Sequence, residues 1–125
     1  MKLKYKEEGS KLEGLELARK IVELAGDKLA SDIVLLDTRE VCSFADYFII
    51  CTGESNRQLA AVTDTINGEL RKIGIIPLHV EGEADSGWIL MDYGDIIIHV
   101  FSPFERDYYQ LEKLWEGAPT KVRVP

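Results

Sequence analysis

The sequence predicts a mixed α/β fold, a five-stranded sheet with flanking helices in the order α-β-β-α-β-β-β-α. Short runs of β-branched and aromatic residues alternate along the chain with segments whose apolar residues recur at helical spacing. At 125 residues the chain has the length of one domain, which would remove roughly two thirds of the unfolded surface from water. We therefore expect a single domain over residues 1–125, with flexible ends at 1–9 and 118–125.

The first half of the chain predicts one helix, two strands and a second helix. Apolar residues at helical spacing place the first helix over residues 10–25, and Gly26 ends it. The runs "SDIVLLDT" and "DYFIICTG" are strand-like, and the second leads into a helix that is capped at Ser55 or Asn56 and ends at Gly74. The next run, "IPLHVEG", returns as a strand, so the strand-helix-strand order implies a right-handed parallel crossover.

The second half predicts an antiparallel hairpin followed by a last helix. In "WILMDYGDIIIHVF", residues 88–101, two strand-like runs flank Tyr93-Gly94, and Gly94 can adopt the positive φ of a tight turn. Asp92 and Asp95 would then flank a two-residue turn directly. In the last segment large apolar residues recur at helical spacing, which predicts one helix. Its apolar stripe, expected to pack on the sheet, consists of Phe104, Tyr108, Leu111 and Trp115.

Composition limits the classes of partner. The chain has 15 Lys and Arg against 22 Asp and Glu, a net charge of -7, so we expect no strong direct nucleic-acid binding and regard a basic protein as the better partner. The N-terminus lacks the apolar stretch of a signal peptide, and no run approaches the ~20 apolar residues that span a bilayer, which predicts a cytoplasmic protein with no membrane partner. Cys42 and Cys51 lack metal or redox spacing and are expected to be reduced.

The hairpin contains the first candidate site, because two carboxylates lie at its turn and His99 follows on the second strand. Short carboxylates beside a turn commonly accept hydrogen bonds from turn N–H groups. A metal site would need ligands that converge on one point, and Asp92, Asp95 and His99 are at most three candidates with no fourth fixed by the sequence. The pattern favours a structural or partner-facing role over catalysis and predicts no bound metal.

A second candidate is "TGESNRQ", residues 52–58, where a strand end meets a helix N-terminus and could bind an anion. Neither GxGxxG nor GxxxxGKS/T is present, and no Asp-x-Asp follows for two-metal phosphoryl transfer. We therefore expect a protein without catalytic residues and without a cofactor. The competing hypothesis is a nucleotide-binding or nucleotidyl-transferring enzyme that uses Ser55 with Asp92 or Asp95.

Trp88 begins a strand directly after the polar loop "EGEADSG". A large amphipathic ring in that position serves either as a core residue or as a contact for a partner. Its position in the sequence leaves both interpretations open.

Four segments between Asp46 and Trp115 resemble, in order, segments of the ribosomal silencing factor family, also called Iojap-like proteins. They are "DYFIICTGESNRQLAAV", "GIIPLHVEG", "WILMDYGDIIIHVF" and "RDYYQLEKLW". Their number and order make this match more specific than any single motif above. The resemblance implies a fold similar to that of the nucleotidyltransferases, without their catalytic residues.

The resemblance also implies a function and a set of contact residues. Proteins of this family bind the large ribosomal subunit through its fourteenth protein and sterically block joining of the small subunit, which represses translation. A homodimer away from the ribosome is implied as well. The family pattern marks a partner-binding surface on this chain, formed by Trp88, Asp92, Tyr93, Gly94, Asp95, His99 and Arg106.

Overall fold

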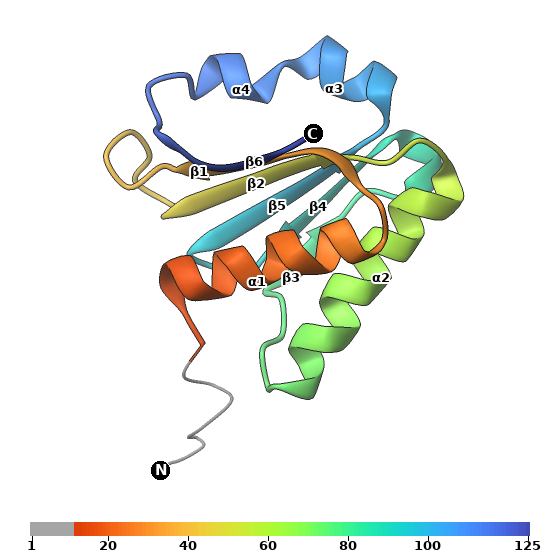
Figure 1. Cartoon of the computed structure of the whole chain (residues 1–125), viewed down its shortest axis with the longest axis horizontal. Helices are drawn as coiled ribbons and strands as arrows, with labels where there is room; N and C mark the ends of the chain where they lie inside the picture. Colours follow the sequence, from red (N-terminus) through yellow and green to blue (C-terminus); the bar gives the residue numbers. More distant parts are fainter. Residues whose placement is uncertain (1–11) are drawn as a thin grey trace.

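A six-stranded mixed sheet lies between two layers of helices in the computed structural model, which describes residues 12–125 (Figure 1). The strand order is β3-β4-β5-β2-β1-β6. The strands are β1 (Ser31–Asp37), β2 (Tyr47–Thr52), β3 (His79–Glu81), β4 (Trp88–Asp92), β5 (Ile96–Phe101) and β6 (Thr120–Val124). The helices are α1 (Gly14–Asp27), α2 (Asn56–Lys72), the 3-10 helix η2 (Ala84–Ser86), α3 (Pro103–Tyr109) and α4 (Leu111–Leu114). None of them has the length and apolar character required to cross a bilayer.

β5 lies inside the sheet, where the parallel and antiparallel parts meet. β2 pairs with β5 in parallel, with Ile50 opposite His99, and β4 pairs with it antiparallel, with Trp88 opposite Phe101. β3 continues the sheet antiparallel to β4, so β3, β5 and β2 all run in the same direction. The predicted parallel crossover through α2 is therefore confirmed, with β5 and β4 lying between the two strands that the crossover connects.

The two faces of the sheet bury separate apolar clusters. α1 and α2 cover one face (Figure 1), where aliphatic side chains such as Ile21 and Leu59 are fully buried. The other face buries an aromatic cluster, in which the rings of Phe48 and Trp115 meet edge to face with their centroids 5.2 Å apart. α3 lies over this second face but buries none of its residues, so the aromatic face is covered less completely than the aliphatic one.

The sheet has a sixth strand that the sequence did not predict. Residues 118–125 were expected to be flexible, but Thr120–Val124 forms β6 and pairs antiparallel with β1, with Val122 opposite Leu35. Val122 packs against the aliphatic cluster while its neighbours in the strand are exposed. Thr120, Val122 and Val124 alternate with two basic residues as in a strand, but the run is only five residues long and lies at the end of the chain, where the prediction favoured flexibility. The predicted flexibility of residues 1–9 falls outside the described residues.

The helices follow the prediction in the middle of the chain and depart from it at both ends. α2 begins where expected, because the Ser55 hydroxyl accepts a hydrogen bond from the Gln58 N–H at 3.1 Å. The first helix, predicted over residues 10–25, runs from Gly14 to Asp27, and residues 12 and 13 precede it without helical structure. The predicted last helix is broken at Gln110, whose φ of 46° is left-handed.

This break divides the predicted apolar stripe. Leu111 and Trp115 turn toward the aromatic cluster, as expected. Phe104 and Tyr108, on the other side of the break, are 71% and 69% exposed. The prediction that all four side chains pack on the sheet is therefore wrong for two of them, because a single left-handed residue rotates α4 relative to α3.

The hairpin turn is displaced by one residue from the predicted position. The Tyr93 N–H donates to the Ile96 carbonyl at 2.9 Å, so these two residues close the turn and Gly94-Asp95 forms its centre. Gly94 has a φ of 90°, as a tight turn requires at that position. Asp95 thus lies within the turn, not beside it.

Removal of residues 120–125 should lower the free energy of unfolding by about 1–3 kcal/mol, because β1 loses its neighbour and Val122 its packing. Urea unfolding followed by circular dichroism measures this change. The matched control is Lys121→Ala on the exposed side of β6, expected within about 0.5 kcal/mol of the unaltered chain. A truncated chain as stable as the unaltered one would show that β6 contributes nothing to folding.

Candidate functional site

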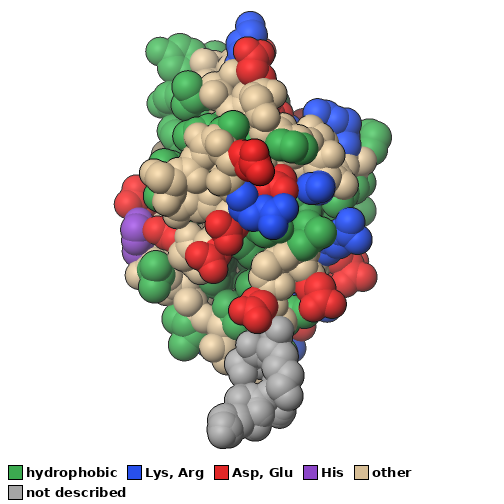
Figure 2. Space-filling model, turned by 90° about the vertical axis from the view of Figure 1, so that its left-hand side faces the viewer, with side chains coloured by type: hydrophobic (Ala, Val, Ile, Leu, Met, Phe, Trp, Pro, Cys, Tyr) green, Lys and Arg blue, Asp and Glu red, His purple; other side chains and the backbone are tan. Residues whose placement is uncertain are grey.

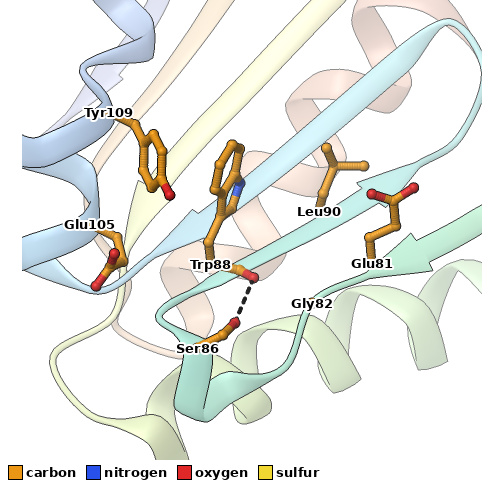
Figure 3. A pocket seen from close by; sticks show the side chains of 7 residues that line it. All are labelled: Glu81, Gly82, Ser86, Trp88, Leu90, Glu105 and Tyr109. Atoms are coloured by element: carbon orange, nitrogen blue, oxygen red, sulfur yellow. Dashed lines mark hydrogen bonds between the residues drawn. The ribbon is translucent and has the colours of Figure 1, made fainter.

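A groove of about 310 Å³ opens on the aromatic face of the sheet, beside Trp88 (Figure 3). Trp88 begins β4 and is half-buried. Its ring centroid lies 5.0 Å from that of Phe101 beneath it and 4.6 Å from that of Tyr109 on α3. The groove is lined by apolar and polar side chains of β3, η2, β4 and α3, namely Glu81, Ser86, Trp88, Leu90, Glu105 and Tyr109. Trp88 is thus packed on one side and accessible from solvent on the other.

His99 fixes the orientation of the Trp88 ring from beneath. The Trp88 Nε1–H donates to His99 Nδ1 at 3.2 Å, and His99 is only 5% exposed. Burial lowers the pKa of His99 from 6.5 to about 4, so the imidazole is neutral near pH 7 and its Nδ1 can accept this hydrogen bond. The ring proton then belongs on Nε2, which is buried without a hydrogen-bond partner among the described residues.

Arg106 connects four segments of the chain and is itself largely enclosed. Its guanidinium donates to the Glu112 carboxylate, to the Asp32 carbonyl at 2.6 Å and to the Thr52 hydroxyl at 2.9 Å. Only 12% of its side chain is exposed. Arg106 therefore joins α3 to α4 and to the adjoining ends of β1 and β2, and it helps to fix the helix that contributes Tyr109 to the groove.

The four remaining residues of the predicted surface lie at the hairpin. Asp92 accepts a hydrogen bond from the Gly94 N–H at 2.8 Å, which is the turn capping expected from the sequence. Asp95 is exposed, while its carbonyl accepts from the N–H groups of Asp46 and Tyr47. Tyr93 packs against the aliphatic cluster, and burial raises its pKa to about 12.

The predicted surface residues are therefore divided between two places. Trp88 lies opposite Phe101 at one end of the hairpin, and Asp92 lies opposite Ile97 at the other. Asp92 is four residue steps along β4 from Trp88, which corresponds to about 13 Å along an extended strand. His99 lies under Trp88, and Arg106 lies at the same end of the sheet, near Thr52.

The same geometry separates the residues of the enzymatic hypothesis. Ser55 follows Thr52, which pairs with Phe101 at the Trp88 end of the sheet, whereas Asp92 and Asp95 lie at the opposite end. Within residues 12–125 no three His, Cys, Asp or Glu side chains gather in a way that could bind a metal ion. Ser55 and the two aspartates are thus not brought together into one site.

Both cysteines are free thiols, and Cys51 is fully buried in β2. Burial raises the pKa of Cys51 to about 12, so it remains a protonated thiol near pH 7. A buried, protonated thiol neither attacks a substrate nor binds a metal, and Cys51 serves as an apolar core residue.

Several groove residues were not identified from the sequence. Glu81, Glu105 and Tyr109 come from β3 and α3, which the chain brings to Trp88 only through tertiary packing. Gly82 gives the one local signal: its φ is 87°, and a Cβ there would collide with the Trp88 carbonyl oxygen. A glycine directly after a strand can indicate such a close approach of two backbone segments.

Two solved structures share this fold. A crystal structure of a protein from Chromobacterium violaceum matches with a TM-score of 0.80 and 35% sequence identity, over 88% of this chain and 93% of that one. A crystal structure from Bacillus halodurans matches with a TM-score of 0.76 and 36% identity, over 87% of this chain and 99% of that one. Fold and site define a small mixed α/β protein with a groove lined by aromatic and acidic side chains.

Sequence comparison identifies the family. The model of the family described as ribosomal silencing factor during starvation matches residues 11–124. The ribosomal silencing factor RsfS of Bacillus subtilis is 44% identical over 93 residues, which are 74% of this chain and 79% of that one. The chloroplastic protein Iojap of Zea mays is 32% identical over 116 residues, 90% of this chain and 49% of that one. The chain belongs to the ribosomal silencing factor family, which confirms the resemblance of its four segments.

His99 should make stability depend on pH. Because its pKa is lower in the folded state (about 4) than in the unfolded state (6.5), the unfolded chain binds more protons between these values. The free energy of unfolding should fall by up to about 3 kcal/mol from pH 6.5 to 4 through this group. His99→Gln should remove that part of the loss and the exposed His79→Gln should retain it, as measured by urea unfolding at each pH. Equal pH profiles for the two variants would contradict this account.

Arg106→Gln should lower the free energy of unfolding by about 2–4 kcal/mol, because Glu112, Asp32 and Thr52 lose their donor. Arg106→Lys should recover only part of the loss, since an ammonium group cannot reproduce the guanidinium geometry. A double-mutant cycle with Glu112→Gln measures the coupling, expected at about 1 kcal/mol or more. Unchanged stability with impaired partner binding would instead make Arg106 a direct partner contact.

Proposed function

We propose that this protein binds the large ribosomal subunit through its fourteenth protein and sterically blocks joining of the small subunit, which represses translation. The observation that supports this most strongly is family membership over residues 11–124. Relatives in Bacillus subtilis and Chromobacterium violaceum are named ribosomal silencing factor, and a mouse relative, 30% identical, is named for mitochondrial assembly of the ribosomal large subunit.

The structure suits a protein that acts by occupying a surface. Steric blocking needs affinity and bulk and no bond-making residues, and the proposed contact surface lies on β4, β5, the turn between them and α3. The net charge of -7 favours association with a basic protein. On the face shown in Figure 2, basic side chains lie among acidic ones and form no continuous stripe of the kind that follows a phosphate backbone.

Within the proposed surface, the residues have different tasks. Trp88 and the hairpin residues Asp92, Gly94 and Asp95 have accessible atoms and would touch the partner. His99 would act from beneath, through the orientation of the Trp88 ring, and Tyr93 and Arg106 would act through the shape of the hairpin and of α3. This division distinguishes contact residues from positioning residues within the surface that the family pattern marked.

Two further features accompany this proposal. A homodimer away from the ribosome would bury part of the exposed apolar surface. The edge strand β3, on which Val80 is exposed, is a suitable place for such a dimer contact. Cytoplasmic localisation, where ribosomal subunits are encountered, remains a prediction from the sequence.

The chain should co-sediment with purified large subunits and not with small ones, and should reduce the formation of joined ribosomes. Trp88→Ala should weaken large-subunit binding by about 2 kcal/mol, roughly 30-fold, if the ring is a central contact. The matched control is Leu29→Ala. Leu29 is 80% exposed and lies outside the proposed surface, so this variant should bind large subunits as the unaltered chain does. Thermal unfolding of both variants shows whether the fold persists. Equal sedimentation with both subunits, or with neither, would overturn the proposed function.

A further inference from the structure

We infer that the groove beside Trp88 receives a basic side chain, lysine or arginine, from the protein partner. The inference rests on the proposed function for the identity of that partner. The preference of the groove for a cation is argued from its own residues and does not depend on that function. Its volume of about 310 Å³ lies at the lower end of the roughly 300–1,000 Å³ typical of small-molecule pockets, which suits one long side chain.

The walls of the groove offer aromatic surface to a cation. Figure 3 shows the Trp88 indole between the Tyr109 ring on one side and Leu90 on the other. A guanidinium or ammonium group is attracted to the face of such rings, most strongly to tryptophan. The aliphatic stem of the same side chain can pack on Leu90 while its charged end remains near water.

The charges around the groove have one sign. Glu81 and Glu105 lie at its two ends, and no Lys or Arg lines it (Figure 3). Within residues 12–125, the only salt-bridge partner of Glu81 is His79, at 2.9 Å, and Glu105 has none. A cation entering the groove would therefore meet Glu105, which has no salt-bridge partner among these residues, and Glu81, whose only such partner is a histidine, whereas a carboxylate or phosphate would be repelled.

The side chains of the groove are also held in place by contacts within the chain. The hydrogen bond to His99 and the packing on Phe101 fix the Trp88 ring. The Ser86 hydroxyl donates to the Glu83 carbonyl at 2.6 Å and lies 3.2 Å from the Trp88 carbonyl, and this fixes η2 against the start of β4. A site that is already ordered loses little conformational entropy on binding, which is what a hot-spot contact requires.

The first test uses the whole isolated chain and small probes. N-acetylarginine methylamide, the corresponding lysine compound and the uncharged citrulline compound are titrated while NMR records the indole N–H signals of Trp88 and Trp115. The Trp88 signal should shift and saturate with the two cations, with a Kd of about 10–100 mM, and should not respond to citrulline. Trp115, which packs within the aromatic cluster, is the internal control. No saturable shift, or an equal response to citrulline, would overturn the inference.

The second test measures large-subunit binding by the double variant Glu81→Gln, Glu105→Gln, which preserves the shape of the groove and removes its charge. Affinity should fall roughly tenfold, and the arginine-induced shift of Trp88 should weaken in the same variant. The matched control, Glu40→Gln with Glu54→Gln, neutralises two exposed carboxylates elsewhere and should bind as the unaltered chain does.

The two tests separate this inference from the proposed function. If the unaltered chain does not bind large subunits but Trp88 still responds to arginine and not to citrulline, the proposed function fails and the cation site stands. If the chain binds large subunits and the groove variant binds equally well, the function stands and the inference is wrong.

Discussion

The burial of β5 on both faces is the constraint on which the rest of the site depends. All six of its residues are buried between β2 and β4, so any polar side chain on this strand must be uncharged and must find its partner locally. His99 is that polar residue. Burial keeps it neutral, and its free Nδ1 lone pair accepts the Trp88 indole N–H. A strand whose residues are all buried thus determines the orientation of the Trp88 ring at the groove.

Arg106 illustrates how position in a family pattern and role in a structure can differ. The pattern placed Arg106 in the partner-binding surface, while its guanidinium is occupied by Glu112, Asp32 and Thr52. An arginine so enclosed affects a surface by fixing the helix that bears it, here α3 with Tyr109 at its end. A loss of binding in an Arg106 variant therefore needs a stability measurement before it can be interpreted as a lost contact.

Local signals predicted much of this fold and little of the groove. The Ser55 cap, the apolar spacing of α2 and a tight turn at Gly94 are each decided by neighbouring residues, and the structure has all three, with the turn displaced by one residue. β6 was missed because its run of five residues is short and lies at the end of the chain, where flexibility was expected. The break at Gln110 was missed because a left-handed glutamine has no local sequence signal. Glu81 and Glu105 are far apart in sequence, so their position on either side of Trp88 follows only from the packing of β3 and α3 on β4.

Under the proposed function, the separation of Trp88 from the hairpin turn bears on how the protein would obtain specificity for its partner. Residues at the two ends of β4 lie about 13 Å apart on one rigid strand, so a partner that reaches both must match the length of the strand. Acidic turn residues at one end mainly affect the rate of encounter with a basic surface, because exposed charges are screened by salt and water. A preformed aromatic groove at the other end would instead slow dissociation, since leaving it exposes apolar surface. The two ends of the strand can therefore control the two rate constants of binding separately.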